Sequence, residues 1–424
     1  MGLDGHEPAG WNGSAGHVWS VHGEGAALKI LLIRLSAVGD VVRTLPALTC
    51  LRRAYPSAHI TWAVEEPSRE ILQDQRDLDE TLVFPRKALS RALLHPSELT
   101  AACGALSLFT ASLKDARFDL VIDFQGTLKS GLMAWLTGAA RRVGPGRGHA
   151  REMSYLFQTD RVRLGERALT RVERALALVA HLGVDISDAT SEIPERPEDA
   201  AYVESFLSTL ATPRLRERSG PPAVLFPGTS RTQAYKRYPP AQFARAADLL
   251  AERTGCPVVV AWGPGEERIA GEVVSAMRSP ATLAPSMTLG QLTSLIRRSR
   301  IFLAGDTGPM HIAWTVGTPV VAIYGPTDPE LNRPGGLHSA TAYEKVFCSP
   351  CRNRGCIART CLEHLPPEKV ADSALGVLRQ VEAARPDRGL AGPEGPRGPG
   401  ASGRNRVSYE TMGPGSRPGR GITE

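Results

Sequence analysis

Four residues in the last third of the chain have the types and spacing of an anion site. The run "RIFLAGDTGPMHI" (300–312) reads as a strand followed by Asp306, Thr307, Gly308 and His311. A proline suits the first turn of a helix, so a helix is predicted near Pro309. Its free N–H groups, the Thr307 hydroxyl and the close approach that Gly308 permits would hold a phosphate beside His311. Capping of this helix by Asp306 alone is the simpler alternative.

Two further segments of the same half have groups that suit a nucleotide. In "LFPGTSRTQAYK" (225–236), a strand is followed by the hydroxyls of Thr229 and Ser230 and then by Lys236, a point charge for a diphosphate. A basic surface loop explains this segment equally well. Glu266 follows the next strand, where a carboxylate often holds ribose hydroxyls, although pairing with a helix dipole is the alternative.

A carboxylate stands in the N-terminal half where a phosphate loop is expected. The stretch "LSAVGDVVRTLPAL" (35–48) follows the apolar run "KILLIR" and contains Gly39 and then Asp40. The turn after the first strand of a nucleotide-binding unit usually offers glycine N–H groups to a phosphate, which Asp40 would repel. A carboxylate suits instead the removal of a proton from a hydroxyl group, and Gly39 would let the ligand that carries this hydroxyl approach the backbone.

Polar and basic residues of the same half suit a polyhydroxyl or anionic ligand. "VIDFQGTLKSG" (121–131) carries Asp123, Gln125 and Lys129 at a strand-to-helix turn, and Arg151 follows the glycine-rich "GPGRGHA". Other arginines of this region, such as Arg171 and Arg174, are expected to be solvated helix positions.

Four cysteines are crowded into "CSPCRNRGCIARTC". A set of this kind is consistent with a structural metal site or a bridge, and equally with reduced thiols. No catalytic role is indicated for them. The four are Cys348, Cys351, Cys356 and Cys361.

Composition bounds the class of protein. The chain has 424 residues, 42% of them apolar and 22% charged, which is ordinary for a soluble protein of two domains. We expect no membrane-spanning helix and no secretory signal. The formal net charge is +6, and half of it falls in residues 385–424, which contain seven arginines and four acidic residues. The basic isoelectric point of the whole chain therefore does not indicate a nucleic-acid partner. The GxGxxG motif of nicotinamide dehydrogenases follows neither first strand, and the sequence contains neither the P-loop motif nor the GxSxG motif of hydrolases.

Apolar runs alternate with helical patterns along most of the chain, which predicts parallel sheets covered by helices. The segment between the strands at 59–64 and 118–126 reads as irregular, and the domain junction is placed in the polar, proline-containing region 192–222. The fold class is therefore α/β, with two Rossmann-like domains facing a central cleft. The predicted parts are a disordered extension (1–27), a first Rossmann-like domain (28–205), a second Rossmann-like domain with the cysteines (220–384) and a disordered tail (385–424).

Several of these segments together resemble one enzyme family. "ILLIRLSAVGDVVRTLPALTCLR", "VIDFQGTLKSG" and especially "GDTGPMHIAWTVGTPVVAIYGPTDP" are similar to the lipopolysaccharide heptosyltransferases, glycosyltransferase family 9, over about residues 28–380. The resemblance implies the GT-B architecture and transfer of a heptose from ADP-heptose to the Kdo-containing core on lipid A. It also implies inversion at the anomeric carbon, no divalent metal and no cofactor.

The resemblance also implies a role for each residue. Asp40 corresponds to the proposed general base, Lys236 with Thr229 or Ser230 to the diphosphate residues, and Arg151 to an acceptor-binding arginine. Residues 28–205 would then form the acceptor-binding domain and residues 220–384 the ADP-sugar-binding domain, with Gly39, Asp123, Gln125 and Lys129 on the acceptor side. Glu266 corresponds to the ribose carboxylate, and the Asp306–His311 turn lies on the donor side. The loop before Lys236 is longer than the family's. Heptosyltransferase I, II or III specificity, another sugar, and a non-catalytic sugar-nucleotide-binding protein remain the alternatives. We expect a monomer, cytoplasmic and peripheral at the inner membrane, where a lipid-anchored acceptor lies.

Overall fold

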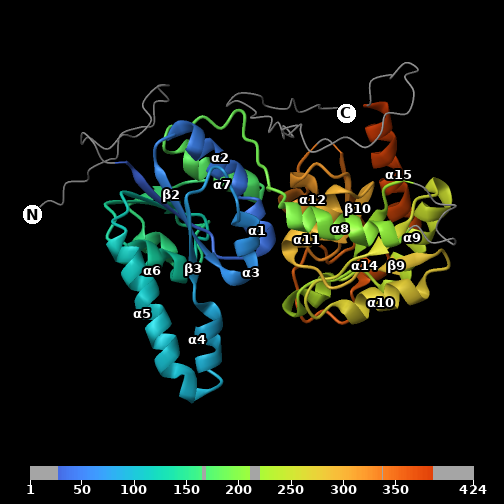
Figure 1. Cartoon of the computed structure of the whole chain (residues 1–424), viewed down its shortest axis with the longest axis horizontal. Coiled ribbons are helices and arrows are strands. Elements are labelled where there is room, and N and C mark those ends of the chain that lie inside the picture. Colours follow the sequence, from blue (N-terminus) through green and yellow to red (C-terminus); the bar gives the residue numbers. More distant parts are fainter. Residues whose placement is uncertain (1–26, 165–168, 211–219, 337, 385–424) are drawn as a thin grey trace, which may run out of the picture.

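Two parallel β-sheets form the frame of the molecule (Figure 1). The computed structural model describes residues 27–164, 169–210, 220–336 and 338–384. Each sheet has six strands, in the orders β3-β2-β1-β4-β5-β6 and β12-β11-β10-β7-β8-β9. The predicted α/β class with two Rossmann-like domains is confirmed. The predicted disordered segments, 1–27 and 385–424, lie outside the described residues apart from residue 27.

The central strand of the first sheet is buried on both faces, as its unbroken apolar run predicts. Ile30 and Leu32 pack into one hydrophobic cluster, whereas Leu31 and Ile33 pack into another on the opposite face. The strands of this domain are β1 (Lys29–Ile33), β2 (His59–Glu65), β3 (Glu80–Phe84), β4 (Leu120–Asp123), β5 (Arg141–Pro145) and β6 (Asp160–Val162). Its helices are α1 (Val38–Val42), α2 (Leu45–Ala54), α3 (Glu66–Arg69), α4 (Arg86–Ala92), α5 (Leu99–Asp115), α6 (Leu128–Leu136) and α7 (Arg171–Ala180).

The second domain repeats the alternation of strand and helix. Its strands are β7 (Ala223–Phe226), β8 (Val258–Val260), β9 (Ala281–Leu283), β10 (Ile301–Gly305), β11 (Val320–Tyr324) and β12 (Ser339–Tyr343). Its helices are α9 (Pro240–Thr254), α10 (Glu267–Ala276), α11 (Leu289–Arg297), α12 (Gly308–Thr315), α13 (Pro329–Asn332), α14 (Thr360–Glu363) and α15 (Pro367–Ala383). The short helix α12 directly follows β10, as the glycine and proline of the motif predict.

The predicted domain boundary at residue 205 is wrong. Helix α8 (Pro197–Thr209) packs against α11 of the second domain, on the far side of the junction from the first sheet (Figure 1). Ion pairs reinforce this packing, because Arg298, the residue after α11, contacts Glu204 of α8 and Glu195 shortly before α8. The crossover between the domains therefore precedes residue 197.

The segment between β2 and β4 is regular, contrary to expectation. It contains β3 and a helical hairpin formed by α4, a short turn (Pro96–Glu98) and α5. The hairpin extends away from the first sheet (Figure 1). The sequence analysis missed it because α4 has no buried residue, and its seven residues therefore lack the apolar stripe that marks a packed helix. Strands β5, β6, β9 and β12 were also not anticipated.

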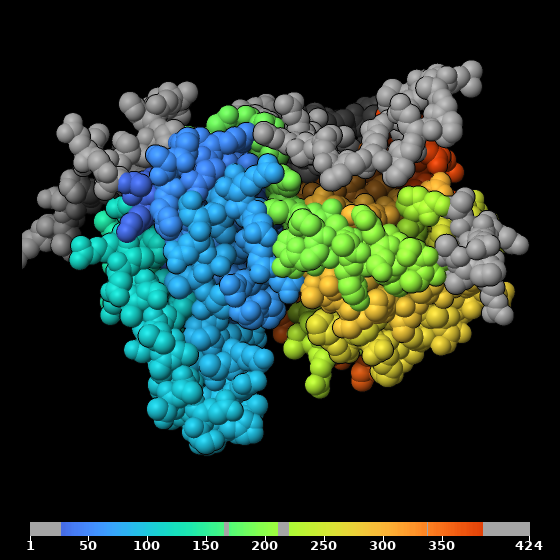
Figure 2. Space-filling model, viewed as in Figure 1, coloured from blue at the N-terminus to red at the C-terminus, as the bar shows by residue number. Residues whose placement is uncertain are grey.

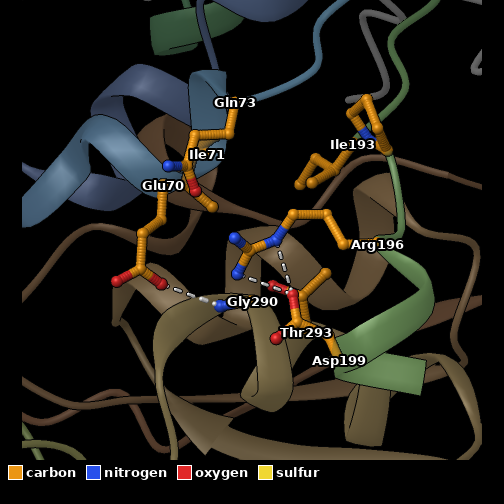
Figure 3. Close-up of a pocket in the computed structure, with 9 residues that line it drawn as sticks. Glu70, Ile71, Gln73, Ile193, Arg196, Asp199, Gly290 and Thr293 are labelled. Atoms are coloured by element: carbon orange, nitrogen blue, oxygen red, sulfur yellow. Dashed lines mark hydrogen bonds and ion pairs between the residues drawn. The ribbon is translucent and has the colours of Figure 1, made fainter. Parts of the chain in front are cut away.

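The two domains meet where α1 packs on α12. Gly39 is buried there, and a Cβ built on it would lie 2.7 Å from His311 Cδ2 and 3.2 Å from Gly308 Cα. Gly39 thus permits the approach of the second domain, and the predicted approach of an acceptor to this backbone is wrong. A second interdomain bond joins the Gly290 N–H to the Glu70 carboxylate at 3.0 Å, beside a small pocket (Figure 3). That pocket contains none of the predicted site residues.

Substitution Gly39→Ala tests this packing. The added methyl group overlaps His311, so we expect the free energy of unfolding to fall by about 1–3 kcal/mol, together with a loss of activity. Gly104→Ala is the matched control, since no atom lies within 4 Å of a Cβ at that exposed helical position. There we expect a gain of about 0.5–1 kcal/mol. Chemical denaturation of both variants checks the result, and equal stabilities would contradict it.

Candidate active site

Asp40 lies among three arginines at the domain contact. Its carboxylate is 3.0 Å from Arg34 Nη2, 2.5 Å from Arg43 Nη2 and 3.7 Å from Arg171 Nη1. Burial disfavours its charged form, but the positive charges of Arg34, Arg43 and Arg171 outweigh burial, so the pKa of Asp40 lies well below its ordinary value. Asp40 is therefore an anion throughout the physiological pH range, with 19% of its side chain exposed.

A second buried ion pair stands at the end of β10 in the opposite domain. Lys236 Nζ lies 2.8 Å from Asp306 Oδ2, and His311 Nε2 lies 3.9 Å from Asp306 Oδ1. Burial opposes ionisation of Asp306, but Lys236 and then His311 lower its pKa below the ordinary value. The capping alternative for Asp306 is wrong, because Thr307 is the residue that precedes α12 and no side chain caps that helix. Asp306 instead holds Lys236 beside the start of α12.

Two buried polar atoms near the start of α12 have no hydrogen-bond partner. They are Thr307 Oγ1 and His311 Nε2. His311 Nδ1 accepts a hydrogen bond from Trp314 Nε1 at 3.2 Å, which places the imidazole proton on Nε2. Burial, followed by the charge of Arg43, keeps the pKa of His311 well below its ordinary value, so the ring is neutral. A buried donor and a buried hydroxyl without partners are typical of a site that a polar ligand completes.

The other predicted donor residues surround the end of β7. Thr229 is buried, and its hydroxyl donates to Gln233 O at 3.0 Å and accepts from Arg237 Nε at 3.1 Å, whereas Ser230 is exposed. Glu266 is buried and accepts a hydrogen bond from Gly263 N at 3.2 Å. Burial raises the pKa of Glu266 above its ordinary value. Of the two hydroxyls, Ser230 is the more accessible to a ligand, because it is exposed and its one side-chain hydrogen bond is the 3.4 Å contact with Thr232 Oγ1.

The Asp123 side chain is enclosed by the protein and does not face solvent. Its carboxylate is fully buried and accepts hydrogen bonds from Gln125 N, Gly126 N, Ser130 Oγ and Gln158 Nε2 at 2.9–3.0 Å. The prediction that this carboxylate contacts an acceptor is therefore wrong. Asp123 instead shapes the turn between β4 and α6. Gln125 Oε1 accepts from Leu35 N at 3.3 Å and ties the same turn to the end of β1.

The burial of Asp123 predicts a pH dependence of stability. Desolvation is the largest influence on this carboxylate and raises its pKa to about 6, against the lowering effect of the bonds from Gly126, Ser130 and Gln125. The folded protein therefore keeps a proton that the unfolded chain loses between about pH 4 and 6. Stability falls as pH rises through that window, by up to about 3 kcal/mol. Urea denaturation should show this component in the wild type and lack it in Asp123→Asn, and parallel pH curves would contradict it.

The remaining acceptor candidates lie on the outer side of the same turn. Lys129 Nζ is 2.8 Å from Glu65 Oε1 and 4.7 Å from the centre of the Phe84 ring. Glu65 also accepts from Arg86 at 2.7 Å. Arg151 is exposed, and its backbone N–H donates to Gly126 O at 2.8 Å. Lys129 and Arg151 thus flank one turn, and both side chains reach solvent.

The arginines around Asp40 were not predicted from the sequence. Arg34 is the last residue of the apolar run "KILLIR", and Arg43 lies three residues after Asp40. Residues at this spacing are neighbours on a helix, so the sequence could have predicted the Arg43–Asp40 pair. The expectation that Arg171 is merely solvated is wrong, because Arg171 contacts Asp40 and also Asn332 of the second domain, at 3.3 Å. Arg43 donates to the same Asn332 oxygen at 3.3 Å, so these arginines also join the domains.

The four late cysteines are free thiols, of which Cys361 is buried. Burial, followed by the neighbouring Cys351 and Cys348, raises the pKa of Cys361 to about 11. Within the part of the chain that the structure describes, no group of three or more His, Cys, Asp or Glu side chains is arranged to hold a metal ion.

Comparison with known proteins places these observations in a class. The Escherichia coli heptosyltransferase WaaC, solved with ADP, has a similar structure, with a TM-score of 0.60 and 25% identity over 74% of this chain and 92% of the other. Lipopolysaccharide heptosyltransferase 1 of Pseudomonas aeruginosa is 28% identical over 84% of this chain and its own full length. Lipopolysaccharide heptosyltransferase 2 of Escherichia coli is 27% identical, with the same coverage.

The two facing domains thus define a glycosyltransferase of the GT-B fold, and the expectation of that fold and of an enzyme is confirmed. The model of glycosyltransferase family 9 (heptosyltransferase) matches residues 107–362. The chain belongs to this family.

Proposed function

We propose that this enzyme transfers a heptose from ADP-heptose to the Kdo-containing inner core of lipid A, with inversion at the anomeric carbon and without a divalent metal. One observation carries the proposal: the Asp40 carboxylate and the Lys236–Asp306 pair stand on the two sides of the α1–α12 contact. This arrangement provides a proton acceptor in one domain and a cation in the other.

The leaving diphosphate requires positive charge and hydrogen-bond donors. Lys236 supplies a cation, and the start of α12 supplies free N–H groups with the Thr307 hydroxyl. Asp306 fixes Lys236 in one position, so little reorganisation is needed as charge develops on the diphosphate. His311, neutral and with a proton on Nε2, adds a donor without adding charge.

The attacking hydroxyl must lose its proton on the opposite face of the sugar. Asp40 is ionised and ready to accept it, although a carboxylate held by three arginines is a weak base. An anionic acceptor would draw Arg171, the most exposed of the three, away from Asp40. Removing that charge raises the proton affinity of Asp40 when the acceptor is bound.

The experiment that tests the function is a product analysis with the purified chain. Mass spectrometry should show one heptose added when ADP-heptose and Kdo–lipid A are supplied, and an excess of EDTA should leave the rate unchanged. An acceptor that already carries the first heptose distinguishes the proposed type I specificity from types II and III. Binding of ADP-heptose with neither transfer nor hydrolysis would instead support the non-catalytic alternative.

The place of action follows from the acceptor. No helix in the described ranges is long and apolar enough to cross a membrane. We propose that the enzyme acts as a monomer in the cytoplasm, at the surface of the inner membrane, because the lipid A anchor of the acceptor is embedded there.

A further inference from the structure

The hairpin α4–α5 exposes apolar side chains that the catalytic account does not use. Leu93 and Leu94, between the two helices, are 87% and 77% exposed, and Leu99 at the start of α5 is 57% exposed. Within residues 86–108 only Ala102 is buried. Burial of a leucine side chain is favourable by about 1.5–3 kcal/mol, so a cluster at the end of a projecting element is typical of a contact surface.

The hairpin has the shape of an extension rather than of a core element. It leaves the first sheet after β3 and returns at β4, and its free end is the part of this domain farthest from the sheet (Figures 1 and 2). The 17 residues of α5 extend about 25 Å. Only Ala102, Phe109 and Leu113 of α5 are buried, and two of these lie in its second half, next to the domain. The tip leucines are therefore presented away from the domain.

The charge of the hairpin indicates the kind of partner that its leucines would contact. Residues 86–108 contain Arg86, Lys87 and Arg91 against one acidic residue, Glu98, a net charge of +2 with His95 neutral. Arg86 is engaged with Glu65, which leaves Arg91, two residues before Leu93, and Lys87, one residue into α4, as the remaining cations of the hairpin. Apolar side chains at a tip with cations behind them fit an anionic bilayer, whose interior takes the leucines while its headgroups take the charges.

The root of the hairpin adjoins the acceptor candidates. Arg86, the first residue of α4, and Lys129, at the turn after β4, share the carboxylate of Glu65. A membrane contact at the tip would therefore fix the distance between the bilayer and the turn where Lys129 and Arg151 lie.

We propose that the α4–α5 tip is the element that anchors this enzyme to an anionic lipid bilayer, with Leu93 and Leu94 inserted among the acyl chains and Lys87 and Arg91 at the headgroups. This rests on the proposed function in that the acceptor is embedded in lipid. A second copy of the chain is the competing occupant of the leucine surface, and the experiment separates the two.

The experiment is flotation of the full chain with vesicles of phosphatidylcholine, with and without phosphatidylglycerol. The wild type should partition onto the anionic vesicles, and Leu93→Ser/Leu94→Ser should lower the partition coefficient at least tenfold. Lys87→Ala/Arg91→Ala should lower it about fivefold for each cation at low salt, with a smaller effect at high salt. The matched control is Phe347→Ser/Ile357→Ser, which removes two side chains, 98% and 95% exposed, from the other domain and should leave partition unchanged.

Equal flotation of the wild type and the leucine variant would overturn the proposal. So would a dimer, seen by sedimentation velocity without lipid, that the leucine variant dissociates. Transfer to an acceptor without acyl chains should be the same in the wild type and the leucine variant. Because flotation needs no turnover, hairpin-dependent flotation of a chain without heptosyltransferase activity would refute the proposed function and leave the anchor intact.

Discussion

Asp40→Asn is expected to lower kcat by about two to four orders of magnitude while ADP binding stays nearly unchanged. The amide keeps the size of the side chain but cannot take the acceptor's proton. It also leaves Arg34, Arg43 and Arg171 without their shared anion, so stability should fall by about 3 kcal/mol. Turnover is therefore measured by release of ADP well below the variant's Tm, and ADP affinity by calorimetry.

Asp372→Asn is the matched control for the loss of a carboxylate. Asp372 pairs with Arg253 on the exposed surface of the second domain, and its removal should change neither turnover nor ADP affinity. In the wild type, kcat/KM should show no acid limb from Asp40 above about pH 4, because the free enzyme holds this carboxyl ionised. Normal turnover in Asp40→Asn would refute the assignment of Asp40 as the base.

Lys236→Ala is expected to weaken ADP binding about ten- to hundredfold and to lower turnover further. The loss of a charge-assisted hydrogen bond to the diphosphate accounts for about 1.5–3 kcal/mol of binding. The substitution also leaves the buried Asp306 unpaired, so the Tm should fall as well. Lys236→Ala/Asp306→Asn removes this secondary effect and should restore much of the Tm without restoring ADP affinity.

Lys369→Ala is the control for loss of a lysine, since Lys369 pairs with Glu344 on the surface, 2.9 Å away. It should leave ADP affinity and Tm unchanged. If calorimetry gave Lys236→Ala the same ADP affinity as the wild type, Lys236 would be a partner of Asp306 only.

The elements that place the site were predictable where local pattern and tertiary role agree. The apolar run before Asp40 and the Gly-Pro turn after Asp306 correctly indicated β1 and α12, because a doubly buried strand and a helix start leave strong local signals. Helix α4 left none, since none of its residues is buried. Helix α8 was recognised as neither a helix nor a part of the second domain, because the residues that hold it on α11 are distant in sequence.

Some of the site residues could be predicted from the sequence, and others could not. Asp40, Lys236 and Asp306 stood out as charged groups in the segments that follow strands, and these remain the candidates for the reaction. The contact of Gly39 with His311 was not visible, because it joins positions 272 residues apart (311 minus 39) through a docking of two domains. Three arginines gather on Asp40 from two helices and a strand end, and only the folded chain brings them together.

The central claim is that transfer takes place beside the α1–α12 contact, with the donor's diphosphate on Lys236 and its anomeric carbon toward Asp40. The most direct measurement is a crystal structure with a non-transferable ADP-heptose analogue. We predict a diphosphate oxygen within hydrogen-bond distance of Lys236 and the start of α12, hydroxyls of the ribose on Glu266, and the anomeric carbon facing the Asp40 carboxylate. A diphosphate bound away from Lys236, or a sugar turned away from Asp40, would contradict the account.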